Sequence, residues 1–371
     1  MKAILTIITL LLSSSTFAGW WFFSSNKIKD DEQIIFFPSE AYQTAGSNDW
    51  RIDFHGWIFE PETLGEINSL VREALNIPAD DDDEHDSLLQ QRLHWFVVDN
   101  ERGKRLSIEL GKQTVKLNPS AANGHFNGET TLTDATLQTL SASNTHRLIR
   151  FKALTHANDK RLFAGEIHPV SLTGLSIISD LDDTIKISNV TNKQELIKNT
   201  FMRPFQAVPG MAELYQQWQQ SHAAIFHYVS ASPWQLYPEL STFMQASRFP
   251  QGLFYMKSFR LKDSSFFNLF SDPVEYKKDI IESIFTRYPQ REFILVGDSG
   301  EKDPEVYGMM ARQYPGRIKR ILIRKVGDNN SLERFTSAFK EIPPGLWQTF
   351  DDAMEIGKTA TALDSVPASA H

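Results

Sequence analysis

The 371-residue sequence contains no cysteine. This absence excludes thiol nucleophiles, cysteine-ligated zinc, iron–sulfur centres and disulfide bonds. The sequence also lacks an excess of positive charge, because its formal net charge is −8. A protein that binds nucleic acids by neutralising their phosphates usually carries a basic surface, so the charge argues against a nucleic-acid partner.

The N-terminus lacks an apolar run of membrane-spanning length. Its apolar stretch, residues 4–12, is shorter than the ~20 residues that a spanning helix needs. The stretch follows Lys2 and precedes small residues that end at Ala18, which predicts a signal peptide over residues 1–18 and export to the periplasm. The alternative is an uncleaved N-terminal membrane anchor, because the aromatic residues 20–23 would prolong the apolar segment to the membrane interface.

The remaining composition is that of a globular protein. Hydrophobic residues make up 41% and charged residues 23% of the chain, and 26 Phe and 8 Trp supply material for a large core. A chain of this length suits roughly two domains of about 100–200 residues each.

Residues 33–171 predict a mostly β, sandwich-like domain. Short segments rich in β-branched and aromatic residues alternate there with turn signals. A helix is expected around residues 64–76, and the acidic run at residues 80–85 is expected to be a solvated loop. The segments expected to be strands are QIIFFPSEAY, WRIDFHGWIFE, RLHWFVVD, RLSIEL, HRLIRFKAL and LFAGEIHPV.

Residues 172–347 predict an α/β domain. Apolar strands alternate there with helical segments, which indicates a parallel sheet with helices on both faces. The tail, residues 351–371, is small and polar and is predicted to be disordered.

Polar side chains gather where the strands of this α/β region end. Ligands bind at the carboxyl ends of strands in an open parallel sheet, so these residues are expected to face one site. Two of the strand ends carry aspartates, a third carries a serine, and lysines lie near the start of a helix. The residues are Asp180, Asp182, Thr184, Ser230, Lys277, Lys278, Asp298 and Asp303.

This set of side chains suits phosphoryl transfer. Carboxylate oxygens are the ligands that Mg²⁺ prefers, and one aspartate can attack phosphorus to form an aspartyl-phosphate. A second acid can protonate the leaving oxygen and later activate water. A hydroxyl and an ammonium group can counter the charge on the transferring phosphoryl oxygens.

The motifs also resemble those of a known family. Asp180-Leu181-Asp182-Asp183-Thr184 is similar to the first motif of the haloacid-dehalogenase-like (HAD-like) phosphatases. The longer strings SDLDDTIKISNV, FHYVSASPWQLYP and ILVGDSGEKDPEVY resemble the App1-type phosphatidate phosphatase catalytic domain. The resemblance covers roughly residues 172–345 and implies a HAD-like Rossmannoid fold.

The resemblance also implies a role for individual residues. Asp180 would be the nucleophile and a Mg²⁺ ligand. Asp182 would be the general acid/base and would give the metal its backbone carbonyl. Ser230 and Lys277 would hold the phosphoryl group, and Asp298 would complete the metal site.

Three assignments stay open from the sequence. Lys278 is adjacent to Lys277, although Lys277 is favoured by its place at the start of the helix. Asp303 can share or replace the role of Asp298 through water. Thr184 suits either a turn cap or a contact with substrate.

The substrate that the resemblance implies is phosphatidate, hydrolysed to diacylglycerol and phosphate. The stretch from Thr184 to Pro209 is too short for a large cap domain, so an open site for a bulky lipid phosphate at a membrane is expected. One alternative is a phosphatase of soluble phosphate esters or phosphoproteins. Another is a metal-stabilised binding protein without catalysis, against which the pairing of Asp180 with Asp182 argues.

Overall fold

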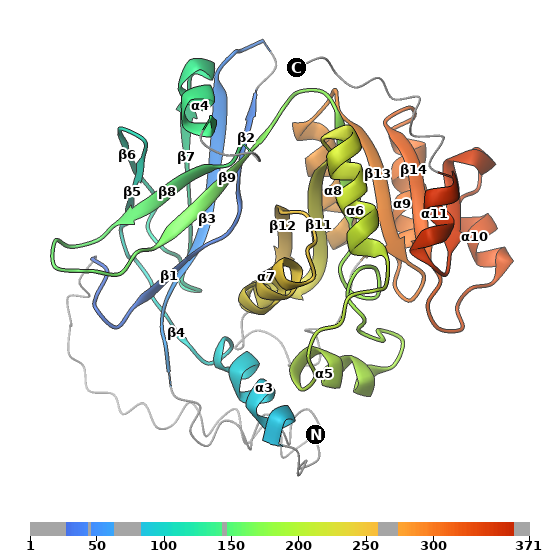
Figure 1. Cartoon of the computed structure of the whole chain (residues 1–371), viewed down its shortest axis with the longest axis horizontal. Helices are drawn as coiled ribbons and strands as arrows, with labels where there is room; N and C mark the ends of the chain where they lie inside the picture. Colours follow the sequence, from blue (N-terminus) through green and yellow to red (C-terminus); the bar gives the residue numbers. More distant parts are fainter. Residues whose placement is uncertain (1–26, 44–45, 63–82, 143–146, 259–273, 360–371) are drawn as a thin grey trace.

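The computed structural model describes residues 27–43, 46–62, 83–142, 147–258 and 274–359 (Figure 1). The expected signal peptide and the helix expected around residues 64–76 lie outside these described residues. Within the described ranges, no helix has both the length and the apolar character needed to cross a membrane.

The first half of the chain forms one nine-stranded sheet with the order β1-β3-β2-β9-β8-β5-β6, in which β4 and β7 also pair with β3. The predicted β-rich region is therefore present as a single sheet around its own hydrophobic core. Its strands are β1 (Gln33–Phe36), β2 (Ser39–Gln43), β3 (Trp50–Glu60), β4 (Asp99–Asn100), β5 (Ser107–Leu110), β6 (Gln113–Lys116), β7 (His125–Leu132), β8 (Ile149–Leu154) and β9 (Ala164–Val170).

Strand β3 shows why the two halves of the chain pack together. Successive side chains of a strand point to opposite faces. Ile52 and Phe54 face the core of the first sheet. Trp57 and Phe59 face a second cluster that also contains residues of the α/β half. Both faces of β3 are thus buried in the C-terminal part of the strand, and the two halves share one hydrophobic cluster.

Two expectations for the first half were wrong. The segment RLHWFVVD is not a strand, because most of it belongs to the end of helix α3 (Asp83–His94) and the turn that follows. Leu89 and Leu93 lie one helical turn apart and are both fully buried, so the helical period fits the burial better than a strand does. The acidic run is helical from Asp83 onward, and residues 80–82 lie outside the described part of the chain.

Strand β7 and helix α4 (Asp134–Ser141) were not expected from the sequence. The strand reads HFNGETTL and is largely polar, yet it pairs with β3 over eight residues. Pairing with a long neighbouring strand therefore outweighed its weak intrinsic preference for β structure.

The second half confirms the predicted α/β fold. Six strands form a sheet with the order β12-β11-β10-β13-β14-β15, and every neighbouring pair is parallel. All five residues of β10 are buried. The strands are β10 (Leu175–Ser179), β11 (Ile225–Pro233), β12 (Gly252–Lys257), β13 (Glu292–Asp298), β14 (Ile318–Arg324) and β15 (Trp347–Phe350).

Helices cover both faces of this parallel sheet, as predicted (Figure 1). Ile177 belongs to the cluster that includes α6, α7 and α11, whereas Ile178 belongs to the cluster that includes α8, α9 and α10. The helices are α5 (Lys193–Phe201), α6 (Met211–His222), α7 (Tyr237–Ala246), α8 (Val274–Arg287), α9 (Asp303–Gln313), α10 (Leu332–Ala338) and α11 (Ala353–Thr359), with short 3₁₀ turns at Trp234–Leu236 and Pro344–Leu346.

The predicted end of the α/β region was placed too early. Strand β15 continues the sheet to Phe350, and helix α11 occupies part of the tail that was expected to be disordered. Ala353 and Ile356 of α11 are buried in the shared cluster, so apolar burial gives this short helix its place. Residues 360–371 lie outside the described part of the chain.

Candidate active site

The strand order places the candidate site. The chain runs from β10 outward to β11 and β12, and then returns to the other side of β10 with β13. The order in which strands are added therefore reverses between β10 and β13, and open α/β sheets bind ligands at such a switch point. Asp180 directly follows β10 and Asp298 ends β13. The Asp180 amide donates to the carbonyl of Val296 at 2.9 Å, which ties the two strand ends together.

Lys277 of helix α8 faces Asp180 across this point. Its side chain is 1% exposed, and its Nζ lies 2.9 Å from Asp180 Oδ1. The same Nζ lies 2.7 Å from Asp303 Oδ1 and 2.8 Å from Glu301 Oε2. Lys278, in contrast, pairs with Glu275 at 3.7 Å and has a 27% exposed side chain. Of the two adjacent lysines, Lys277 is therefore the one that faces the aspartates.

Three acidic side chains gather beside this lysine. Asp180, Asp298 and Glu301 each offer a carboxylate oxygen, and these oxygens lie within 4.8 Å of one another. Asp180 Oδ2 and Asp298 Oδ2 are buried and have no hydrogen-bond partner among the described residues. Such crowding of buried charge is costly unless a cation compensates for it.

The pKa values of the two aspartates reflect this crowding. Burial raises the pKa of Asp180 well above its usual range, and Asp303, Glu301 and Asp298 raise it further, although Lys277 opposes them. Burial also raises the pKa of Asp298, with added repulsion from Asp303 and Glu301. A bound cation would lower both pKa values, because it favours the ionised carboxylates.

Asp303 lies beside the acidic trio and makes structural contacts. Its Oδ1 accepts from Lys277, and its Oδ2 accepts from the backbone amide of Asp298 at 3.1 Å. It therefore fixes both the lysine and the end of β13. Gly297 leaves room for it, because a Cβ at that position would lie 2.3 Å from Asp303 Oδ2.

Glu301 was missed from the sequence. The turn after β13 brings it back to the site, because Asp298 Oδ1 accepts from the amides of Gly300 at 2.6 Å and Glu301 at 3.2 Å. The signal was available in the string GDSGEKD, where Glu301 stands three residues after Asp298.

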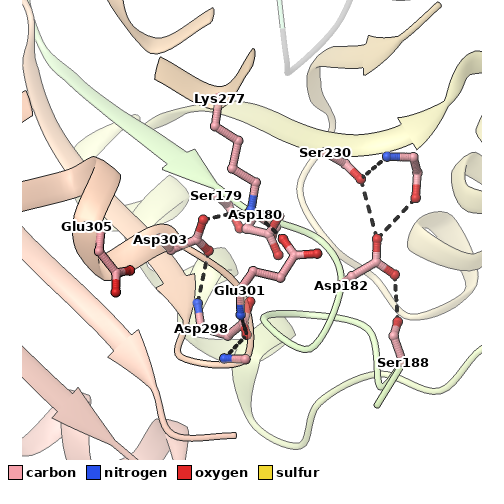
Figure 2. A network of polar contacts seen from close by, with 12 residues as sticks. Ser179, Asp180, Asp182, Ser188, Ser230, Lys277, Asp298, Glu301, Asp303 and Glu305 are labelled. Atoms are coloured by element: carbon pink, nitrogen blue, oxygen red, sulfur yellow. Dashed lines mark hydrogen bonds and ion pairs between the residues drawn. The ribbon is translucent and has the colours of Figure 1, made fainter. Parts of the chain in front are cut away.

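Asp182 occupies a different environment, on the other side of Asp180 (Figure 2). Its Oδ1 lies 2.7 Å from Lys186 Nζ and accepts from the Ser188 hydroxyl at 2.6 Å. Its Oδ2 accepts from Ser232 at 3.1 Å and from Ser230 at 3.4 Å. Burial alone would raise the pKa of Asp182, but Lys186 and the hydrogen bonds hold that pKa below its usual range.

Ser230 lies in β11 and is 1% exposed. Its hydroxyl accepts from the amide of Ser232 at 3.0 Å and donates to Asp182. The structure therefore brings Ser230 to Asp182. Ser232 and Lys186 join the same network and were not predicted as site residues.

The next two residues of the first motif have separate surroundings. Asp183 has a left-handed backbone (φ +57°), and its carboxylate accepts from the amides of Ser188 at 2.8 Å, Asn189 at 2.9 Å and Val190 at 2.6 Å. It organises the loop that carries Ser188. Thr184 is fully buried, and its hydroxyl has no hydrogen-bond partner within the described residues.

The second half is a Rossmannoid, HAD-like domain. Three features define this class: a parallel sheet with an Asp-x-Asp motif after its first strand, a buried lysine on α8 and an acidic turn after β13. Residues 175–325 match the family model described as "Phosphatidate phosphatase APP1, catalytic domain". The match confirms the resemblance to this family that the motifs predicted.

Two curated relatives are similar to this chain over part of its length. The phosphatidate phosphatase APP1 of Saccharomyces cerevisiae is 35% identical over 158 residues, which cover 42% of this chain and 26% of the relative. An uncharacterized protein of Schizosaccharomyces pombe is 30% identical over 171 residues, covering 45% of this chain and 27% of the relative. The matched region spans about a quarter of each relative's length.

Among solved structures, a putative β-phosphoglucomutase from Thermotoga maritima aligns with a TM-score of 0.29 and 10% identity, over 52% of this chain and 99% of that one.

Proposed function

We propose that the protein is a Mg²⁺-dependent phosphatase that hydrolyses a phosphomonoester, and that its substrate is a lipid phosphate such as phosphatidate. The observation that carries the proposal is the position of Asp180. It lies at the switch point of the sheet, between Lys277 and two further carboxylates, Asp298 and Glu301.

The residues present fit a magnesium ion. Asp180, Asp298 and Glu301 would hold it, since their oxygens converge and two buried carboxylate oxygens have no other partner among the described residues. Mg²⁺ is bound by oxygen ligands of this kind. The backbone carbonyl of Asp182 is the further ligand that the family resemblance implies. When bound, the ion would neutralise negative charge on the carboxylates and on the phosphoryl oxygens.

The proposed reaction has two displacements at phosphorus. An oxygen of Asp180 bonds to phosphorus while the ester oxygen leaves, and Asp182 gives that oxygen its proton. Asp182 then takes a proton from a water molecule, whose oxygen bonds to phosphorus and releases phosphate from Asp180. Lys277 and Ser230 would hold the phosphoryl oxygens through both steps.

The lipid substrate is supported by the family match and by the name of the yeast relative. Phosphatidate would give diacylglycerol and phosphate. We further propose that the chain is exported to the periplasm through residues 1–18, and that it contacts a membrane peripherally to reach its substrate. The alternative within the same chemistry is a soluble ester or a phosphoprotein.

The catalytic proposal is tested with purified protein and p-nitrophenyl phosphate. Activity with Mg²⁺ is expected to vanish on treatment with EDTA and to fall by at least about 10³-fold in Asp180→Asn, since that variant lacks the nucleophile. The matched control is Asp279→Asn, an exposed aspartate on α8. Full activity in Asp180→Asn would disprove the mechanism, and inactivity of the wild type on every ester would favour a binding protein.

The substrate proposal needs a separate comparison. Rates are measured on phosphatidate in vesicles and on soluble sugar and nucleotide phosphates at equal concentration. A clear preference for the lipid is expected. If a soluble ester is hydrolysed far faster, the lipid assignment is wrong while the phosphatase mechanism stands.

A further inference from the structure

Lys186 is a buried cation that the proposed reaction does not use. Its side chain is 2% exposed, although it lies in a loop only four residues after Asp182. Its Nζ is 2.7 Å from Asp182 Oδ1 and also donates to the Ser188 hydroxyl. Ser188 in turn donates to the same Asp182 oxygen at 2.6 Å. A buried lysine is costly unless its charge is paired, and here the partner is the expected general acid.

The two oxygens of Asp182 therefore have separate surroundings. Lys186 and Ser188 hold Oδ1, whereas Oδ2 faces Ser232 and Ser230, the serine expected to bind the phosphoryl group. Figure 2 shows Asp182 between Ser188 on one side and Ser230 on the other. One oxygen is fixed, so the other is directed to the place where the ester oxygen would leave.

Lys186 is itself held firmly. Its amide donates to the carbonyl of Leu181 at 2.9 Å, and its carbonyl accepts from the amide of Asp183 at 2.6 Å. Its ammonium lies 4.9 Å from the centre of the Phe205 ring. Backbone bonds and an aromatic contact thus restrict its position before any substrate arrives.

We propose that Lys186 is a positioning residue for Asp182. This inference rests on the proposed phosphatase function and adds a residue to it. Lys186 holds Oδ1 so that Oδ2 carries the proton to the leaving oxygen as the phosphorus–oxygen ester bond breaks. It also balances the charge of the carboxylate that remains, which then takes a proton from the attacking water.

The test compares leaving groups. An alkoxide from phosphatidate needs a proton as it leaves, whereas p-nitrophenolate is stable without one. In Lys186→Met, kcat/KM is expected to fall by about 10²-fold for dioctanoyl phosphatidate and by less than about tenfold for p-nitrophenyl phosphate. Phenyl phosphate, which matches the nitrophenyl ester in shape but has a poorer leaving group, should lie between them. The ratio kcat/KM is used because it includes the departure of the leaving group.

Matched variants separate positioning from a structural role. Lys186→Arg should recover part of the loss on phosphatidate. Ser188→Ala, like Lys186→Met, should lower kcat/KM more for phosphatidate than for p-nitrophenyl phosphate. The side chain of Lys198 is 39% exposed and pairs with Glu195, so Lys198→Met should leave kcat/KM unchanged for both substrates. Thermal unfolding of each variant checks folding, and Ser188→Ala decides the question if Lys186→Met does not fold.

An equal loss on all three esters in a folded variant would overturn the proposal, because it would indicate a phosphate contact or a general disturbance. Unchanged activity would overturn it as well. If the wild type hydrolyses none of the esters, the proposed function fails first, which separates that failure from a failure of the Lys186 assignment.

Discussion

Asp180 and Asp182 stand two residues apart and are both buried, yet the protein surrounds them in opposite ways. Asp180 faces three further carboxylates and one lysine, and its pKa is raised. Asp182 faces a lysine and three serines, and its pKa is lowered. The first environment is overloaded with negative charge, whereas the second is balanced by its own side chains.

The two environments would therefore respond differently to a bound cation. In the proposed function, a bound cation would compensate for the excess negative charge around Asp180 and would lower its raised pKa. The Asp182 carboxylate is already balanced by Lys186. A phosphoryl group bound near Ser230 would add negative charge beside Asp182 and raise the pKa of Asp182. Substrate binding would therefore favour the protonated form of Asp182, which can give its proton to the leaving oxygen.

The largest effect on stability is expected for Asp182→Asn. This change leaves the ammonium of Lys186 buried without its counter-charge, which should lower the free energy of unfolding by about 3–5 kcal/mol. Urea unfolding of the metal-free protein measures it, with Asp279→Asn as the exposed control. A loss below about 1 kcal/mol would show that Lys186 is balanced by other groups.

An aspartate-to-asparagine substitution in the acidic trio beside Asp180 should change stability in the opposite direction. Asp298→Asn removes one of the crowded charges, while the new amide oxygen can still accept from Gly300. We expect the metal-free protein to become more stable by about 1–2 kcal/mol, and the stabilisation by added Mg²⁺ to disappear. Thermal unfolding with EDTA and with Mg²⁺ checks both. A destabilised variant that still responds to Mg²⁺ would contradict the proposed ligand set.

The pH dependence of stability sharpens this contrast. The pKa of Asp298 is raised in the folded state, so above its ordinary value of 3.8 the unfolded chain releases a proton that the folded chain keeps. Its contribution to stability is therefore present at low pH and is lost as pH rises from about 4 upward. Urea midpoints in EDTA should show the advantage of Asp298→Asn over the wild type growing with pH. A constant difference would argue against a raised pKa.

The sequence predicted most of the fold and much of the candidate site, for the same physical reason. Apolar strands that alternate with helices define a parallel sheet, and the carboxyl ends of its strands lie at one edge, so the sequence alone predicts that Asp180 and Asp298 lie together. The prediction of a strand at RLHWFVVD was wrong because Leu89 and Leu93 also fit a helical period. Only their packing in the core distinguishes a helix from a strand at this place.

The residues that were missed depend on loops rather than on strands. Glu301 reaches the site because Asp298 binds two amides of the turn after β13. Lys186 reaches Asp182 because the chain turns back through hydrogen bonds between Leu181, Asp183 and Lys186. Periodicity says nothing about such turns. The string GDSGEKD carried a signal for Glu301, whereas no motif in the sequence pointed to the contact of Lys186 with Asp182.

The smallest predicted effect on activity concerns the link between the β-rich half and the Asp182 side. Arg92 of α3 is buried, donates to the carbonyls of Thr200 at 2.9 Å and Arg203 at 2.8 Å, and lies 3.8 Å from the Phe205 ring that Lys186 also contacts. Arg92→Met leaves these two carbonyls without their partner, so the free energy of unfolding should fall by about 1–3 kcal/mol.

The activity of Arg92→Met then distinguishes the two sides of the site. Because Arg92 touches the surroundings of Lys186 and not the acidic trio, kcat on phosphatidate should fall a few-fold while the Mg²⁺ concentration for half-maximal activity stays unchanged. Arg150→Met, whose side chain is 79% exposed in a surface ion pair, is the matched control and should change neither quantity. A shift in the Mg²⁺ requirement of Arg92→Met would mean that the two environments are coupled, so the separation between Asp180 and Asp182 would no longer hold.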